Sequence, residues 1–144
     1  MAQIEDPVDW NFAAEAVNEG EADLVFRAVI EPGWHVYSQF IEEGGPIPTS
    51  FAFNPSPAYE RMGDISESPR PTTAFDQNFQ MDIAWHDQEV TFRQRIKVNE
   101  PTTVSGVVEF MVCNDEKCLP PAEVEFRIPT SAAGLTATSA VPAE

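Results

Sequence analysis

Basic residues are scarce in this sequence. Only 8 lysines and arginines stand against 24 aspartates and glutamates, so the formal net charge is -16. A surface with this charge repels phosphate groups, which argues against nucleic acid or an anionic membrane as a partner. The acidity leaves two interpretations open: the solvated surface of a secreted or salt-adapted protein, or a field that steers a basic partner toward the molecule.

Long apolar segments are also missing. No stretch approaches the roughly 18 consecutive apolar residues that cross a bilayer, and the N-terminus lacks the basic-then-apolar layout of a signal peptide. Because Met1 to Gln3 leads directly into an acidic segment, we expect a periplasmic protein whose export signal has been removed. Residues 130–144 consist almost entirely of Ala, Ser, Thr, Gly and Pro, which predicts a disordered tail or linker after one domain over residues 1–129.

Apolar and polar residues alternate along several segments, which is the pattern of half-buried strands. The clearest strand is predicted from Val90 to Val98, and a turn from Asn18 to Glu21 is predicted to join two others. A short helix from Phe12 to Val17 is an alternative for part of the first one. The further predicted strands are Trp10 to Ala16, Leu24 to Ile30, Thr49 to Phe53, Val104 to Cys113 and Glu123 to Ile128.

About seven short strands separated by turn signals predict an all-β fold, an immunoglobulin-like antiparallel β-sandwich. The segment from Asn54 to Gln80 contains Pro, Ser and Asp residues and shows little periodicity. We therefore predict a long connection there, of the kind that is usually functional or mobile in a small domain.

Cysteine occurs only twice, at Cys113 and Cys118. Four polar residues separate the pair, a length that suits a hairpin loop, so the two cysteines are expected to face each other across its base. Directly opposed residues on antiparallel strands lie about 4.5 to 5.5 Å apart, within the range of a disulfide bond. The pair is therefore able to form a disulfide.

The role of this disulfide stays open on residue type and spacing alone. Closing a loop of about six residues contributes only about 2 kcal/mol of stability, so both an exchangeable pair and a local staple are consistent with the spacing. A zinc site is less favoured because two thiolates need further ligands, and His35 and His86 are distant in sequence and typical of surface or core histidines. A copper site using Met111 with the two cysteines is a further alternative.

An exchangeable disulfide needs a sulfur that a partner thiolate reaches, together with protection from other thiols. Phe75 and Phe79 are therefore candidates for a lid, with simple core packing as the alternative for both. The acidic loop residues Asp115 and Glu116 disfavour a nearby thiolate, and Lys117 offsets them only partly.

Three segments together resemble a known family. The first segment is Pro32 to Ser38. The second consists of two short pieces, Asp76 to Phe79 and Val90 to Phe92. The third is Gly106 to Pro121, which contains the cluster Cys-Asn-Asp-x-x-Cys-x-Pro-Pro. The chain is similar, from about Val8 to Pro129, to the N-terminal domains of the transmembrane thiol:disulfide interchange protein DsbD, the disulfide bond corrector domain family.

The resemblance implies an immunoglobulin-like domain of the periplasm that takes electrons from a thioredoxin-like domain and passes them to oxidised periplasmic proteins. Cys113 and Cys118 would be the catalytic redox pair of this protein-disulfide reductase, and no cofactor or metal is required. An aromatic cap would shield the disulfide, with Phe79 as the first choice and Phe75 as the second. Tyr37 and Trp34 would line the site or belong to the core.

Enterobacterial members of the family have a longer loop between the two cysteines than the four residues found here. The membrane-spanning and thioredoxin-like parts of the full-length family proteins are absent from this sequence. The electron donor is therefore open, and a transmembrane domain is a candidate besides a thioredoxin-like domain. The competing interpretation is an immunoglobulin-like binding or chaperone module in which the disulfide only stiffens a recognition hairpin.

Overall fold

The structure, a computed structural model, describes residues 6–77 and 79–130. Every regular element in these residues is a strand. In chain order the strands are β1 (Val8–Asn18), β2 (Glu21–Ile30), β3 (His35–Tyr37), β4 (Ser50–Phe53), β5 (Tyr59–Ser68), β6 (Thr72–Asp76), β7 (Met81–His86), β8 (Glu89–Val98), β9 (Thr102–Phe110), β10 (Val112–Cys113) and β11 (Ala122–Thr130). None of the described residues forms a helix long and apolar enough to cross a membrane.

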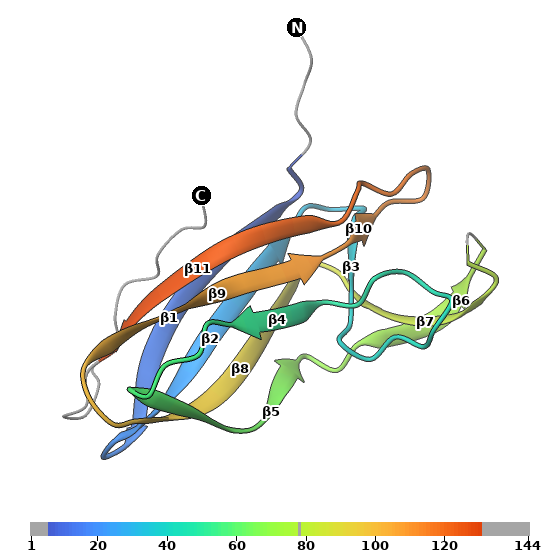
Figure 1. Ribbon diagram of the computed structural model, residues 1–144. Helices are drawn as coiled ribbons and strands as arrows, with labels where there is room; N and C mark the ends of the chain where they lie inside the picture. The colour runs from blue at the N-terminus through green and yellow to red at the C-terminus, as the bar shows by residue number, and fades with distance from the viewer. Residues whose placement is uncertain (1–5, 78, 131–144) are drawn as a thin grey trace, which may run out of the picture.

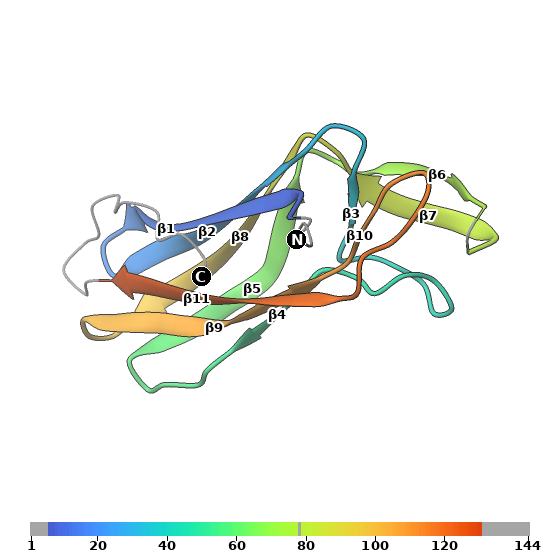
Figure 2. The same ribbon diagram turned by 90° about the horizontal axis from the view of Figure 1, so that it is seen from above.

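Two antiparallel sheets form the sandwich. One has the strand order β1-β2-β8-β5 and the other has the order β11-β9-β4. Figure 1 and Figure 2 show these sheets as two facing layers, so the predicted immunoglobulin-like sandwich is confirmed. The alternative helix from Phe12 to Val17 is wrong, because this segment continues β1 in register with β2.

The core between the two layers is strongly aromatic. Phe12, Phe26 and Phe126 are almost completely buried, and Phe126 contacts both other rings, with centroids 5.8 and 4.9 Å away. Gly106 on β9 pairs with Phe126 on the neighbouring strand β11. A side chain at Gly106 would collide with the Phe126 ring and with the backbone of Ala52. Glycine is therefore required where three strands approach one another most closely.

The segment from Asn54 to Gln80 is not the unstructured connection that we predicted. It contains the ten-residue strand β5, which pairs with β8, and the five-residue strand β6, which pairs with β7. β5 lies at the edge of its sheet and exposes most of its residues, so it has no apolar row to display in the sequence.

A bulge further obscures the pattern of β5. Its register against β8 shifts between Met62 and Ser66, and Gly63 adopts a φ of +76° within this bulge. The fully buried amide of Gln94 on β8 donates hydrogen bonds to the carbonyl oxygens of Met62 and Gly63, 3.3 and 3.2 Å away. The one polar side chain in the inner row of β8 therefore holds the irregular strand in place.

A third, smaller sheet lies at one end of the sandwich and has the strand order β10-β3-β7-β6. Figure 2 shows the β6–β7 hairpin extending from this end beside the loop that follows β10. This group of four strands is called the small sheet below. It contains Cys113 on β10, His35 to Tyr37 on β3 and Asp76 on β6, whereas the motif residues Val90 to Phe92 lie on β8 of the sandwich. We predicted a tail over residues 130–144. Thr130 is the last residue of β11, and residues 131–144 lie outside the described residues.

Candidate functional site

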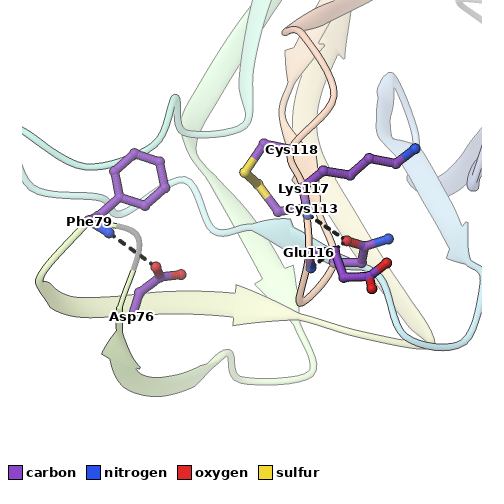
Figure 3. The surroundings of a disulfide bond; sticks show 7 residues. Asp76, Phe79, Cys113, Glu116, Lys117 and Cys118 are labelled. Atoms are coloured by element: carbon purple, nitrogen blue, oxygen red, sulfur yellow. Dashed lines mark hydrogen bonds between the residues drawn. A yellow bond between two sulfur atoms is a disulfide. The ribbon is translucent and has the colours of Figure 1, made fainter.

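The two cysteines lie at the base of a tight hairpin loop, as predicted. Cys113 and Cys118 form an antiparallel bridge and a disulfide bond, with Cα atoms 4.0 Å apart and an S–S distance of 2.00 Å. The side chain of Asn114 shapes the loop, because its Oδ1 accepts hydrogen bonds of 2.8 Å from the backbone N–H groups of Glu116 and Lys117. Figure 3 shows this loop and the disulfide. An asparagine directly after the first cysteine therefore replaces missing backbone partners and closes the turn.

The two sulfur-bearing residues differ in burial. Cys113 is only 2 % exposed and packs with Tyr37 and Ile83, whereas Cys118 is partly exposed and lies at the edge of this cluster. A thiol that attacks the disulfide from solvent therefore reaches Cys118 more easily than Cys113.

Four side chains share the face of the small sheet that carries Cys113. His35 lies directly opposite Cys113 in the β10–β3 pair, and Trp85 lies directly opposite Tyr37 in the β3–β7 pair. Directly opposed residues in an antiparallel sheet point to the same face. These four residues, with neighbours on β6 and in the hairpin loop, line a cavity of about 410 Å³.

The His35 ring stacks on the Trp85 ring, with centroids 3.8 Å apart and planes inclined by 24°. Sequence reasoning had treated His35 as an ordinary histidine and had not selected Trp85. The alternation of His35, Val36 and Tyr37 was the available signal, since it places His35 and Tyr37 on one face and Val36 in the main core.

The turn of the β6–β7 hairpin carries Phe79. The carboxylate of Asp76 accepts a 3.2 Å hydrogen bond from the Phe79 N–H, and the Asp76 carbonyl accepts one of 2.7 Å from the Gln80 N–H. Phe79 is partly buried and packs against the cluster of Tyr37, Ile83 and Cys113. Figure 3 shows its ring on the side of the hairpin that faces the disulfide.

The other aromatic candidates occupy different places. Phe75 also borders the cavity but is 58 % exposed. Trp34 is 8 % exposed and belongs to the main sandwich core, and it is not among the residues that line the cavity. The structure therefore packs Phe79 and Tyr37 in the cluster that contains Cys113, places Phe75 at the border of the cavity, and places Trp34 in the main core.

The electrostatic setting of the cavity is acidic. Asp76 and Asp115 line it. Burial and, to a smaller extent, the negative charge of Asp76 raise the pKa of Tyr37 to about 12, so its hydroxyl stays protonated at neutral pH. Tyr37 therefore acts as a neutral, partly polar wall of the cavity.

A buried polar cluster joins the small sheet to the sandwich next to this cavity. His86 on β7 donates a 2.6 Å hydrogen bond from Nε2 to Oε2 of Glu67 on β5, and both side chains are at most 3 % exposed. The backbone N–H and the side-chain amide of Gln39 each donate a 3.0 Å hydrogen bond to Oε1 of Glu67. Burial alone would raise the pKa of Glu67, but the hydrogen bonds from His86, Ser38 and Gln39 lower it to about 2. Glu67 is therefore an ionised anchor.

No group of three or more His, Cys, Asp or Glu side chains within residues 6–77 and 79–130 is arranged to hold a metal ion. Of the three residues considered for copper, Met111 packs beside the disulfide, and Cys113 and Cys118 are bonded to each other. In this oxidised form the two sulfurs are not thiolate ligands.

Comparison with protein families gives a match over residues 3–130. The matching family is described as the thiol:disulfide interchange protein DsbD, N-terminal. No curated protein sequence matches the chain significantly.

Several solved structures resemble the fold. The reduced N-terminal domain of DsbD from Neisseria meningitidis aligns with a TM-score of 0.61 and 17% identity over 94% of this chain and 90% of that chain. The N-terminal periplasmic domain of ScsB from Proteus mirabilis aligns with a TM-score of 0.62 and 17% identity over 89% of this chain and 47% of that chain. This chain therefore spans about half of the ScsB domain.

A third similar structure is the complex between the DsbD N-terminal and the PilB N-terminal domains from Neisseria meningitidis, with a TM-score of 0.57 and 16% identity over 83% of this chain and 80% of that chain. At such identities these likenesses show a common fold.

Proposed function

Since the chain belongs to the family of N-terminal domains of the thiol:disulfide interchange protein DsbD, we propose that it relays electrons in the periplasm by thiol–disulfide exchange. A thioredoxin-like or transmembrane donor reduces the Cys113–Cys118 disulfide, and the resulting dithiol reduces oxidised periplasmic proteins. The domain thus acts as a protein-disulfide reductase or as one part of such an enzyme.

One observation carries this proposal: the disulfide has one buried and one partly exposed cysteine beside an open cavity. A bond that only stabilises the fold would gain more by joining distant strands, because a loop of about six residues contributes only about 2 kcal/mol. An asymmetric pair is suited to exchange, since one sulfur receives the partner and the other resolves the mixed disulfide.

The geometry favours Cys118 as the sulfur that bonds to the partner. In the reductase direction, the Cys118 thiolate attacks a partner disulfide, a bond forms between the two proteins, and one partner sulfur leaves as a thiolate. Cys113 then attacks Cys118, which restores the internal disulfide and releases the second partner sulfur with its electron pair. Two electrons pass to the partner, and no cofactor is needed.

We assign the cap role to Phe79, with Phe75 as the second candidate. The partly buried ring of Phe79 packs against the cluster that contains Cys113 and borders Cys118. Displacement of this ring by a docking partner would open the disulfide, whereas small thiols would meet it closed. Tyr37 then forms the inner wall of the site, and Trp34 supports β3 from the core.

Two further findings support the partners and the compartment. The similar Neisseria meningitidis structure is a complex of a DsbD N-terminal domain with another protein domain, and the similar ScsB domain is periplasmic. The net charge of -16 disfavours nucleic acid and is compatible with a protein partner.

Trapping of the mixed disulfide tests this function. A Cys113→Ser variant retains Cys118. Its thiolate is expected to form a stable adduct with a thioredoxin-like domain that lacks its own resolving cysteine and carries thionitrobenzoate on its remaining cysteine, with thionitrobenzoate as the leaving group. The Cys118→Ser variant is expected to form far less adduct. A redox titration of the unmodified protein should give a potential above about -300 mV. Failure of both variants to form an adduct, together with a disulfide that resists reduction at that potential, would establish the binding module instead.

A further inference from the structure

His35 occupies a position that the exchange reaction leaves unexplained. It is the direct cross-strand neighbour of Cys113, and both residues line the 410 Å³ cavity. Side chains that face each other in this way have Cβ atoms about 4.5 to 5.5 Å apart. The imidazole and the buried sulfur therefore border the same cavity.

The orientation of this imidazole is restricted. It stacks on Trp85 of the neighbouring strand with a centroid distance of 3.8 Å. The ring nitrogens exchange protons in the plane of the ring, so stacking on Trp85 does not block this exchange. The stacked ring of His35 is also ordered before a partner binds, so little side-chain conformational entropy is lost when the ring takes part in proton transfer.

The reaction needs a proton acceptor at Cys113. In the reduced form this residue carries a thiol, and only its thiolate attacks the mixed disulfide. Cys113 is 2 % exposed, so bulk water has little access to its proton and burial disfavours the charged sulfur. A base inside the cavity accepts the proton in place of bulk water, and its positive charge after protonation stabilises the buried thiolate.

The titratable groups around His35 come from each element that borders the cavity. They are Cys113 on β10, Tyr37 on β3, Asp76 on β6 and Asp115 in the hairpin loop, while β7 contributes the uncharged Trp85. With a pKa of about 12, which burial and then Asp76 raise, Tyr37 is a poor base at neutral pH. Histidine is the side chain whose protonation ordinarily changes between about pH 5 and pH 8.

We propose that His35 is the acid–base group for Cys113 in the exchange reaction. This inference rests on the proposed function. In the resolving step, neutral His35 accepts the proton of the Cys113 thiol, and the freed electron pair of that sulfur forms the bond to Cys118. The bond between Cys118 and the partner sulfur breaks, and its electron pair leaves with the partner as a thiolate. Protonated His35 then returns its proton to that thiolate or to water. In the reverse direction, His35 protonates the Cys113 thiolate as the disulfide opens.

The colorimetric disulfide 5,5′-dithiobis(2-nitrobenzoic acid) separates the two steps in the reduced protein. Attack by Cys118 releases the first thionitrobenzoate in a phase whose rate depends on reagent concentration. Attack by Cys113 releases the second in a phase that is independent of this concentration. Because thionitrobenzoate is a good leaving group, the second phase reports the deprotonation and attack of Cys113.

Two substitutions remove the base in different ways. His35→Phe keeps an aromatic ring for stacking on Trp85, and His35→Gln keeps a polar side chain. Both are expected to slow the second phase at least about tenfold, with a much smaller effect on the first phase. The rate of the second phase in the unmodified protein should rise with pH through an inflection, and both variants should lose this inflection.

Chemical rescue and two neighbouring variants complete the test. In His35→Ala, added imidazole should restore the second phase, a result that a purely structural role would not produce. Asp76→Asn and Asp115→Asn should retain the inflection, and its loss in either one would move the base to that carboxylate and overturn the assignment of His35.

The outcomes distinguish the two levels of inference. If the unmodified protein releases both thionitrobenzoates and the His35 variants do so with the same rate and pH profile, the role of His35 is wrong and the proposed function stands. If the reduced unmodified protein never releases the second one, its cysteines do not close again and both proposals fail.

Discussion

The sandwich core and the small sheet are built from the same kind of strand but differ in how they are filled. In the sandwich, the rings of Phe12, Phe26 and Phe126 are at most 1 % exposed and contact one another. The apolar cluster of the small sheet has only three buried residues, Tyr37, Ile83 and Cys113, and its other members are half-exposed. The dense packing is thus concentrated in one part of the molecule, and the proposed exchange site lies in the other.

This difference has a physical reason. A reactive sulfur must be approached by another protein, so its surroundings cannot be filled as densely as a core. The small sheet instead uses a cavity on one face, a partly buried aromatic ring and a charged anchor at Glu67. The comparison predicts that substitutions in the two regions separate stability from exchange.

The largest loss of stability is expected from Phe126→Ala. This ring is fully buried and contacts Phe12, Phe26 and Phe53, so its removal leaves a cavity between the two layers. We expect the free energy of unfolding to fall by about 3 to 5 kcal/mol, measured by urea denaturation. The rate of exchange per folded molecule should remain near that of the unmodified protein.

Phe40→Ala provides the matched control, because Phe40 is 68 % exposed. Its effect on unfolding should be below about 0.5 kcal/mol. An equal loss of stability in the two variants would contradict the assignment of the stabilising core to the sandwich.

An intermediate loss of stability is expected at Glu67, which anchors the small sheet to the sandwich. Glu67→Gln removes the charge that His86 and Gln39 are arranged to bind, and we expect a loss of about 2 to 3 kcal/mol at neutral pH. The pKa of Glu67 is about 2 in the folded protein and 4.5 as its ordinary value. Its stabilising contribution is therefore complete above about pH 4.5 and is lost as the pH falls toward 2.

Urea denaturation at a series of pH values checks this expectation. The unmodified protein should lose stability between about pH 4.5 and pH 2, and Glu67→Gln should show a flatter profile in that window. Glu89→Gln, which breaks the exposed ion pair with Arg27, is the control and should change stability far less. Identical profiles for the Glu67 and Glu89 variants would refute the anchor.

The same contrast explains what could be predicted from the sequence. β8 alternates because one face is buried in the dense core, and Cys113 and Cys118 are close in sequence, so both were predictable from local patterns. β5 and β6 were missed because strands that bury little carry no apolar row. The cavity was missed because it depends on β10 pairing with β3, about 75 residues away in the chain.

The residues of the site also differ in how far the sequence could predict them. Phe79 was selected with Phe75 as a lid candidate, and the family resemblance ranked it first. The resemblance alone selected Tyr37, because it carries long-range information that periodicity lacks. The local alternation places His35 on one face with Tyr37, but only the register of three strands brings His35 and Trp85 to the face that carries Cys113. Sequence reasoning therefore located the two cysteines of the disulfide and only part of their surroundings.

The smallest effect on stability is expected at the proposed cap. Phe79 is partly buried and packs only at the edge of the small cluster, so Phe79→Ala should lower the free energy of unfolding by about 1 kcal/mol or less. Its effect on reactivity should be larger, because the ring no longer covers the disulfide. We expect dithiothreitol to reduce the Cys113–Cys118 bond several-fold faster, followed by the rate of appearance of free thiol.

Phe75→Ala decides between the two aromatic candidates. Phe75 is 58 % exposed at the border of the cavity, so its removal should change the rate of reduction less than Phe79→Ala does. A faster reduction in Phe75→Ala alone would transfer the cap to that residue. Unchanged rates in both variants would mean that the small sheet leaves Cys118 open, and protection from small thiols would then have to come from the sulfurs' own burial.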